Sequence, residues 1–237
     1  MMPVVSTLSF QPMGDAAVLM RFPQSVQGIS DPAIRMSRQL DGVDCPGVIE
    51  WSIGYHCLAV YFDPLVVDLA AVTAWLEIAY GEICAASSKK GEPDAAVVEI
   101  PVCYGGVHGP DLTEVAVHTG LAAQEVIHRH QQPLYRVVMI GFAPGFPYLS
   151  GMDQTLATPR KATPRLKIAA GAVGIAGKQT GVYPFSTPGG WQIIGRTPLP
   201  LFDVNASPPT SLRPGDYVRF SAISEEEYDV LRQQHNR

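Results

Sequence analysis

Short apolar runs alternate with segments of helical spacing in the first part of the chain. The runs with the length and apolar content of strands are DAAVLMRF (15–22), GVIEWSIG (47–54) and YHCLAVYF (55–62). The segments with helical spacing are DPAIRMSRQL (31–40) and VDLAAVTAWLEIAYGEI (67–83). In the first of these helices, Asp31 is placed as the N-cap and Pro32 as the first helical residue. This order, followed by the apolar run AAVVEIPV (95–102), predicts a split βαβ, ferredoxin-like α/β sandwich.

The pattern changes after the polar segment SSKKGEPD (87–94), which predicts a linker. We therefore expect an α+β chain, with an N-terminal α/β domain over residues 1–92 and a second domain over residues 93–237. The second domain has short apolar runs separated by Gly- and Pro-rich turns, at 135–142, 172–177, 179–184, 191–197 and 216–223. Many short strands with regular turns predict a closed or nearly closed β-barrel.

Helical segments flank these strands. Asp111 with Glu114 forms a predicted capping box for a short helix over 111–120, and a second short helix is predicted over 121–130. Ser224 with Glu227 forms another capping box for a last helix over 224–234. Tyr228 of that last helix is expected to face inward.

Composition narrows the classes of function. The formal net charge is −5 and the sequence pI is about 5.6, so the chain lacks the basic footprint of a nucleic-acid-binding protein. We find no apolar run long enough for a membrane span and no basic, signal-like start, so we expect a cytoplasmic protein. The four cysteines form no CxxC pair, which argues against a zinc ribbon and favours reduced thiols.

One Gly- and Pro-dense segment, GVYPFSTPGGWQIIGRTP (181–198), carries residues suited to binding. Gly189 and Gly190 permit close approach of the backbone, and Trp191 can form a wall. Arg196 offers a planar fork of donors that suits a carboxylate or a phosphate. The segment is interpreted either as a rigid pocket rim for an anionic substrate or as a barrel corner with a surface arginine.

A second segment, TPRKATPR (158–165), repeats a Thr-Pro-Arg triplet. Arg160 and Arg165 on this stiff loop form a candidate clamp for an anion, or they are two solvated arginines. In GIAGKQTGVYP (174–184), the polar residues Gln179, Thr180 and Tyr183 can orient a substrate or satisfy the loop backbone. This stretch is not a phosphate-binding P-loop, because Gln179 stands where Ser or Thr is needed.

Histidines and nucleophiles give weaker signals. No spacing among the six histidines predicts a metal site, so none is expected. The absence of GxSxG excludes the nucleophile elbow of α/β-hydrolases.

Several longer motifs resemble one known family. They are CYGGVHGPDLTEVA, IGFAPGFPYLSGM, TPRKATPR, GAVGIAGKQTGVYPFSTPGGWQIIGRTP and LRPGDYVRF. They are similar to allophanate hydrolase subunit 1, a carboxyltransferase-domain family that includes the B subunit of 5-oxoprolinase and a sporulation-kinase inhibitor. The resemblance implies an N-terminal α/β domain and a C-terminal cyclophilin-like β-barrel, where cyclophilin-like refers to fold alone.

The resemblance also implies a reaction and partners. The reaction is the ATP-dependent opening of the 5-oxoproline lactam to glutamate, with ATP used by a hetero-oligomeric complex. The partners are allophanate hydrolase subunit 2, which corresponds to the C subunit of 5-oxoprolinase, and the A subunit of the same enzyme. Departures from the family pattern at Val107, His108, Lys167 and Ala172 concern fine contacts with the substrate.

Candidate roles follow from this resemblance. Arg160, Arg165 or Arg196 would pair with the substrate carboxylate. Tyr183 and Gln179 would orient the lactam or a phosphorylated intermediate, and His130 is a candidate for proton transfer or for orienting a neighbour.

Three functions stay open at this point. The first is an enzyme subunit that is inactive alone. The second is a regulatory protein that binds and inhibits a sensor histidine kinase. The third is an allophanate or other amide hydrolase, for which no set of nucleophile, base and orienting residue is visible.

Overall fold

The computed structural model describes residues 7–23, 31–86 and 96–235, and it divides the chain into two units, Met1–Asp94 and Ala95–Arg237. The predicted linker at 87–94 lies outside the described residues. No helix in these described ranges combines the length and the apolar character needed to cross a membrane.

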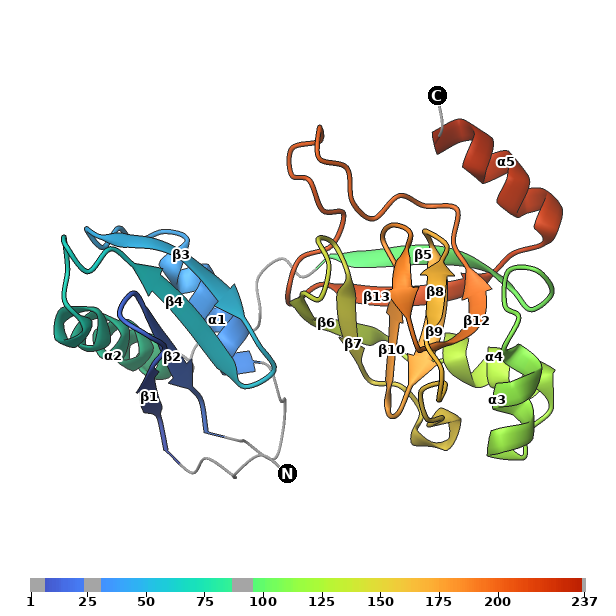
Figure 1. Cartoon of the computed structure of the whole chain (residues 1–237), viewed down its shortest axis with the longest axis horizontal. Helices are drawn as coiled ribbons and strands as arrows, with labels where there is room; N and C mark the ends of the chain where they lie inside the picture. Colours follow the sequence, from blue (N-terminus) through green and yellow to red (C-terminus); the bar gives the residue numbers. More distant parts are fainter. Residues whose placement is uncertain (1–6, 24–30, 87–95, 236–237) are drawn as a thin grey trace. The chain divides into compact units, whose positions relative to one another are not determined.

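The first unit is a four-stranded antiparallel sheet with two helices (Figure 1). The strands run in the order β1 (Ser9–Pro12), β2 (Ala17–Arg21), β4 (Cys57–Phe62) and β3 (Val48–Ile53). Helices α1 (Asp31–Leu40) and α2 (Leu69–Ala86) share one core with the sheet. Alternate strand residues such as Val18, Met20 and Val60 are fully buried in that core, as expected for a sheet covered on one face.

This sheet contains the predicted split βαβ unit, because β4 lies between β2 and β3. The position of the fourth strand differs from the sequence pattern. It is occupied by β1, which pairs with β2 and for which no strand was predicted. The apolar run at 95–102 instead forms β5 (Val97–Tyr104), which belongs to the second unit.

The second unit is a closed barrel of seven strands in the order β10-β7-β6-β13-β5-β12-β9. Their bounds are Gln179–Val182 (β10), Pro147–Ser150 (β7), Tyr135–Ile140 (β6), Tyr217–Ala222 (β13), Gln192–Arg196 (β12) and Ala172–Ala176 (β9). Strands β13 and β5 are parallel, and the other pairs are antiparallel. The predicted barrel is therefore confirmed.

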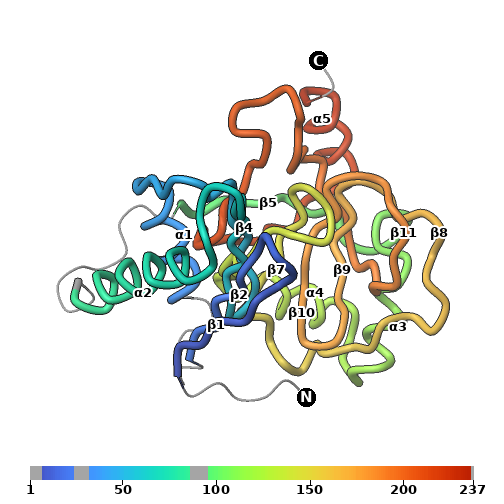
Figure 2. The backbone as a smooth tube through the Cα atoms, turned by 60° about the vertical axis from the view of Figure 1, so that its left-hand side comes forward, coloured from blue at the N-terminus to red at the C-terminus, as the bar shows by residue number. Residues whose placement is uncertain are grey.

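A separate two-stranded sheet lies beside the barrel strands, as the tube in Figure 2 shows. It pairs β8 (Arg165–Ile168) with β11 (Thr187–Gly189). These two strands join the TPRKATPR segment to the Gly189–Gly190 turn, so the two segments singled out in the sequence are neighbours in space.

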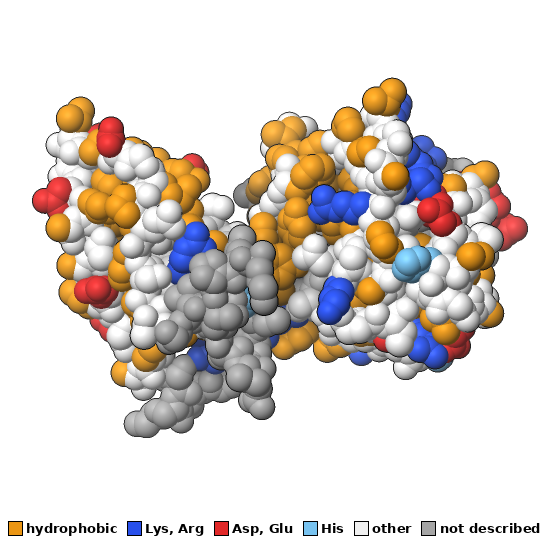
Figure 3. All heavy atoms as spheres, turned by 60° about the horizontal axis from the view of Figure 1, so that its bottom comes forward, with side chains coloured by type: hydrophobic (Ala, Val, Ile, Leu, Met, Phe, Trp, Pro, Cys, Tyr) orange, Lys and Arg blue, Asp and Glu red, His pale blue; other side chains and the backbone are white. Residues whose placement is uncertain are grey.

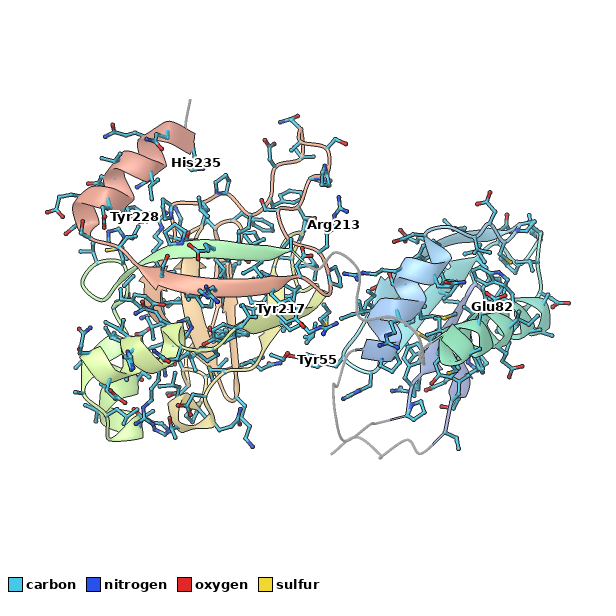
Figure 4. The ribbon with its side chains drawn as sticks, turned by 180° about the vertical axis from the view of Figure 1, so that it is seen from behind. Tyr55, Glu82, Arg213, Tyr217, Tyr228 and His235 are labelled. Carbon is cyan, nitrogen blue, oxygen red and sulfur yellow. The ribbon has the colours of Figure 1, made fainter. Side chains whose placement is uncertain are left out.

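Helices α3 (Leu112–Thr119) and α4 (Ala123–Gln131) pack on the barrel core through residues that include Val115 and Val126. The short 3₁₀ helix η1 (Gln154–Leu156) follows β7. Helix α5 (Glu225–His235) has the predicted capping box, with Glu227 N–H donating to Ser224 Oγ and Ser224 N–H donating to Glu227. Tyr228 projects from α5 toward the barrel and is buried (Figure 4).

The capping box predicted for Asp111 and Glu114 is wrong. Asp111 stands at the N-cap position of α3 but makes no capping hydrogen bond there. Its carboxylate is directed to a different set of donors, which are described below.

On the face shown in Figure 3, Lys and Arg side chains of the barrel unit lie in separate small groups, with hydrophobic and uncharged surface between them.

Candidate functional site

An aromatic pocket opens on the barrel unit, with a volume of about 250 Å³. Its walls come from the segment between β6 and β7, from the TPRKATPR segment and from the chain around β11. The lining residues are Phe142, Phe146, Tyr148, Arg160, Pro164, Tyr183, Pro188, Gly189, Gly190 and Trp191. The pocket is therefore mostly apolar, with a few polar groups, as small-molecule sites usually are.

Phe146 is at the centre of the aromatic walls. Its ring centroid lies 5.1 Å from that of Tyr148, 5.3 Å from that of Tyr183 and 5.4 Å from that of Trp191. The interplanar angles of 61°, 81° and 84° make these edge-to-face contacts. Such contacts are favourable for aromatic quadrupoles and fix the rings against one another. The aromatic side chains of the pocket wall therefore support one another.

Phe142 at the rim has an unusual backbone conformation. Its φ of 68° is in the left-handed region, where a bulky residue is strained, and its side chain is 64% exposed. The exposed ring contacts Phe146 edge to face at 5.5 Å. Strain of this kind costs on the order of 1–3 kcal/mol and concentrates at functional sites.

The Tyr183 hydroxyl leaves no room for a side chain at Gly189. A Cβ atom at this position would collide with that hydroxyl and would lie 2.7 Å from Ile168 Cδ1. Gly190 is different, because a Cβ there would make ordinary contacts of 3.7–3.8 Å with Lys161 O and Pro164. Only the first glycine of the pair is therefore demanded by packing.

The Tyr183 phenol stays protonated at neutral pH. Burial raises its pKa to about 12, although the backbone N–H of Trp191 and the positive charge of Arg160 act in the opposite direction. A protonated phenol hydroxyl is a hydrogen-bond donor. Tyr183 can thus donate a hydrogen bond to a carbonyl or carboxylate oxygen in the pocket.

Arg160 is the charged side chain among the lining residues that the structure describes. It is exposed. Its positive charge lowers the pKa of Tyr148, against a larger upward effect of burial. An exposed guanidinium at the mouth of an apolar pocket can bind an anionic group of a ligand whose remaining atoms contact the aromatic rings.

Arg165, from the second Thr-Pro-Arg triplet, lies outside this lining and pairs with Asp111. Arg165 Nη1 donates to Asp111 Oδ2 at 2.8 Å, and Nη2 donates to Oδ1 at 2.7 Å. This is a two-pronged contact between a guanidinium and a carboxylate. The partner of Arg165 in the structure is therefore the carboxylate of Asp111, whereas the predicted partner was the carboxylate of a ligand.

Asp111 receives two further donors. Ile193 N–H donates to Oδ2 at 2.7 Å, and Lys161 Nζ donates to Oδ1 at 3.1 Å. Burial raises the pKa of Asp111, but the hydrogen bonds from Arg165, Ile193 and Lys161 together outweigh burial and hold the pKa below its usual value. Asp111 is ionised at neutral pH as a result.

Lys161 and Gln192 extend this network to Glu114. Lys161 Nζ donates to Glu114 Oε2 at 2.7 Å, and Gln192 Nε2 donates to Glu114 Oε1 at 3.2 Å. Sequence reasoning missed the roles of Lys161 and Gln192. The available signal was that both residues are adjacent to predicted site residues, namely Arg160 and Trp191.

Arg196 lies outside the pocket lining. Its Nε donates to Ala170 O at 2.7 Å, and its guanidinium carbon is 6.0 Å from the centre of the Tyr228 ring of α5. Arg196 is the last residue of β12, and its guanidinium contacts Tyr228 of α5, so it takes part in the packing of the C-terminal helix.

His130 is in the interior of the barrel, with no exposed surface. Its Nδ1 is 2.8 Å from Tyr104 Oη, and its Nε2 is 2.9 Å from Thr180 Oγ1. Because Thr180 donates its own proton to Gly174 O at 3.0 Å, it accepts from His130 Nε2–H, and Nδ1 accepts from Tyr104. Burial lowers the pKa of His130 to about 3.

The predicted site residues thus separate into two groups. Arg160, Tyr183, Gly189, Gly190 and Trp191 are brought together in the pocket. The remaining predicted residues are not among its lining residues: Arg165, Arg196, Gln179, Thr180 and His130.

Comparisons with known proteins agree with the motifs. The family model described as carboxyltransferase domain, subdomain C and D, matches residues 8–212. The 5-oxoprolinase B subunit of Bacillus subtilis (strain 168) is 42% identical over 231 residues, covering 94% of this chain and 96% of the relative.

Two solved structures have a similar fold. The crystal structure of TTHA0988 has a TM-score of 0.75 and 36% identity, over 88% of this chain and 40% of that chain. This chain therefore spans less than half of the length of TTHA0988. The K. lactis urea amidolyase has a TM-score of 0.74 at 20% identity, over 98% of this chain and 16% of the amidolyase, which shows a common fold. The chain belongs to the carboxyltransferase domain family, subdomains C and D.

Proposed function

We propose that the chain is the B subunit of a multi-subunit, ATP-dependent 5-oxoprolinase, which opens the 5-oxoproline lactam to glutamate. The observation that carries the proposal is the 42% identity to the 5-oxoprolinase B subunit of Bacillus subtilis over nearly the full length of both chains. Identity that covers both units of the fold supports a shared role for the whole chain rather than for one domain.

The pocket chemistry supports a substrate of this kind. 5-Oxoproline is a small, nearly flat ring with one carboxylate. In the proposed arrangement the ring contacts the faces and edges of Trp191 and Phe146, and the carboxylate pairs with Arg160. Tyr183 donates a hydrogen bond to the lactam oxygen. The volume of about 250 Å³ is below that of a pocket for a drug-sized ligand and suits a small metabolite.

The pocket does not fit ATP. A triphosphate needs several cations or backbone donors around it, whereas the described lining offers one guanidinium. The described lining also lacks a histidine, carboxylate, cysteine or serine to act as base or nucleophile. In the proposal this chain binds and orients the lactam, and the other proteins of the complex handle ATP and supply the catalytic base.

The proposed partners are the C and A subunits of such a complex. The test is the release of glutamate from 5-oxoproline and ATP, measured for this chain alone and for its mixture with both partner proteins from the same genome. We expect release from the mixture and none from the chain alone. A stable complex of all three proteins without glutamate release would contradict the proposed substrate, and release by the chain alone would contradict the subunit role.

A further inference from the structure

Asp111 is a buried carboxylate that connects three separate segments of the barrel unit. Its side chain is 4% exposed. It accepts hydrogen bonds from Arg165 at 2.7 and 2.8 Å, from Ile193 N–H at 2.7 Å and from Lys161 at 3.1 Å. Four donors satisfy both carboxylate oxygens, which is the condition for burying a charge of this kind.

Each donor is one or two positions away, along the sequence, from a residue that lines the pocket. Lys161 directly follows Arg160, and Arg165 directly follows Pro164. Ile193 lies two residues after Trp191, in strand β12. The Asp111 carboxylate thus contacts two residues of the TPRKATPR segment, both after Arg160, and also strand β12, which begins next to Trp191.

Two more hydrogen bonds tie the same segments together. Lys161 N–H donates to Gly190 O at 2.7 Å, and Gln192 Nε2 donates to Pro159 O at 3.2 Å. Arg160 itself is exposed, so its position depends on the residues on either side of it. A loop residue whose neighbours are held by hydrogen bonds is pre-organised for binding, whereas a free loop loses conformational entropy when a ligand binds.

We propose that Asp111 is a positioning residue of the pocket, which sets the distance between the Arg160 guanidinium and the Trp191 wall by holding Lys161, Arg165 and the Ile193 amide together. Asp111 is not among the lining residues, so it acts through these neighbours. The ligand class is a small planar ring with a carboxylate, which rests on the proposed function; the positioning role itself rests on the hydrogen bonds.

The kinetic test uses Asp111→Asn in the reconstituted complex, with Lys161→Met as a second variant that leaves the contact between Asp111 and Arg165 intact. Tyr135→Phe is the control, because it removes a buried hydrogen bond from Tyr135 Oη to His130 O, 2.7 Å long, away from the pocket lining. We expect both test variants to raise KM for 5-oxoproline by about tenfold, with kcat changed much less. Tyr135→Phe lowers only the amount of folded protein.

The split between KM and kcat separates positioning from stability. A variant that merely unfolds part of the population lowers the apparent kcat and leaves KM unchanged, since the remaining folded molecules bind normally. Unchanged KM in folded Asp111→Asn protein would overturn the positioning role. If that variant does not fold, unchanged KM in Lys161→Met would overturn it.

A spectroscopic readout is independent of the substrate. Labelling with 5-fluorotryptophan gives one fluorine resonance for each of the three tryptophans, and Trp191→Phe assigns one of them. We expect the Trp191 resonance to move in Lys161→Met and to keep its position in Tyr135→Phe. If the unmodified complex has no turnover, the proposed function fails, and this resonance alone decides the positioning role: an unmoved Trp191 resonance in Lys161→Met overturns it.

Discussion

The two Thr-Pro-Arg triplets have the same sequence and different surroundings. Arg160 is exposed at the mouth of the aromatic pocket, whereas Arg165, five positions later, pairs through two hydrogen bonds with the buried carboxylate of Asp111. An identical local sequence therefore gives one residue available to a ligand and one residue that fastens the loop. The difference arises from the partner that the fold brings to each side chain, and the triplet itself does not encode it.

The largest expected difference between the two arginines is in the free energy of unfolding. Arg165→Ala leaves Asp111 buried with fewer donors, and breaking a buried pair on one side costs roughly 3–5 kcal/mol when both partners are buried. Arg165 is 31% exposed and Asp111 keeps Lys161 and the Ile193 amide, so we expect a loss of roughly 2 kcal/mol. Arg160→Ala should change stability by less than about 0.5 kcal/mol.

Urea unfolding of the two variants measures this difference directly. The same residue type is removed in both, so the change of net charge is matched. Equal unfolding midpoints for Arg165→Ala and Arg160→Ala would contradict the division of roles between the triplets.

The glycine pair gives a second contrast in the same pocket. Gly189→Ala would press a methyl group against the Tyr183 hydroxyl and Ile168 Cδ1, and overpacking of this kind costs roughly 1–3 kcal/mol. Gly190→Ala makes only ordinary contacts and should leave the free energy of unfolding nearly unchanged. Thermal unfolding of the two variants is the measurement, and a Gly190→Ala protein that is the less stable of the two would show that the pocket geometry is misassigned.

The smallest expected effect is the pH dependence of stability that arises from His130. This residue is fully buried in the barrel, whereas Arg160 is exposed to solvent. Burial lowers the pKa of His130 to about 3, so between pH 6.5 and 3 the unfolded chain binds a proton that the folded chain does not. The free energy of unfolding therefore falls as the pH drops below 6.5, by roughly 1 kcal/mol at pH 5.5. The neutral groups that face the ring are Tyr104, Thr180, Tyr135 and Phe220.

Comparing the pH dependence of unfolding for the natural chain and for His130→Gln isolates this contribution. The fall between pH 7.5 and 5.5 should be smaller in the variant, because glutamine does not titrate. In the natural chain, an imidazole NMR signal of His130 that titrates near pH 6.5 would show that the ring is accessible to protons, contrary to the buried network.

The sequence predicted the barrel and most of its strands because apolar runs and Gly/Pro turns are local signals. It did not predict β1 and β7, since each has only four residues and includes a proline, which is unusual within strands. It predicted the pocket residues Tyr183, Gly189, Gly190 and Trp191 because they follow one another in a single segment. It assigned Asp111 to a helix cap because Glu114 follows three positions later, at the spacing of a capping box.

The partners of Asp111 could not be found locally. Lys161 is 50 positions away from it, Arg165 is 54 positions away and Ile193 is 82 positions away. The closure of the barrel brings these segments together. The hydrophobic periodicity of the sequence contains no signal for such long-range contacts. The burial of His130 could not be predicted locally either, because a histidine that is fully hydrogen-bonded inside a barrel has the same sequence signature as one in a catalytic site.

In the proposed function, Arg160 is the anion-binding group of a 5-oxoproline pocket. The most direct test is KM for 5-oxoproline in the reconstituted complex, measured with Arg160→Ala and with Arg196→Ala as the charge-matched control. Loss of a charge-assisted hydrogen bond predicts a rise in KM of at least about tenfold for Arg160→Ala, with KM unchanged for Arg196→Ala. An unchanged KM in a folded Arg160→Ala complex would show that Arg160 does not bind the substrate carboxylate.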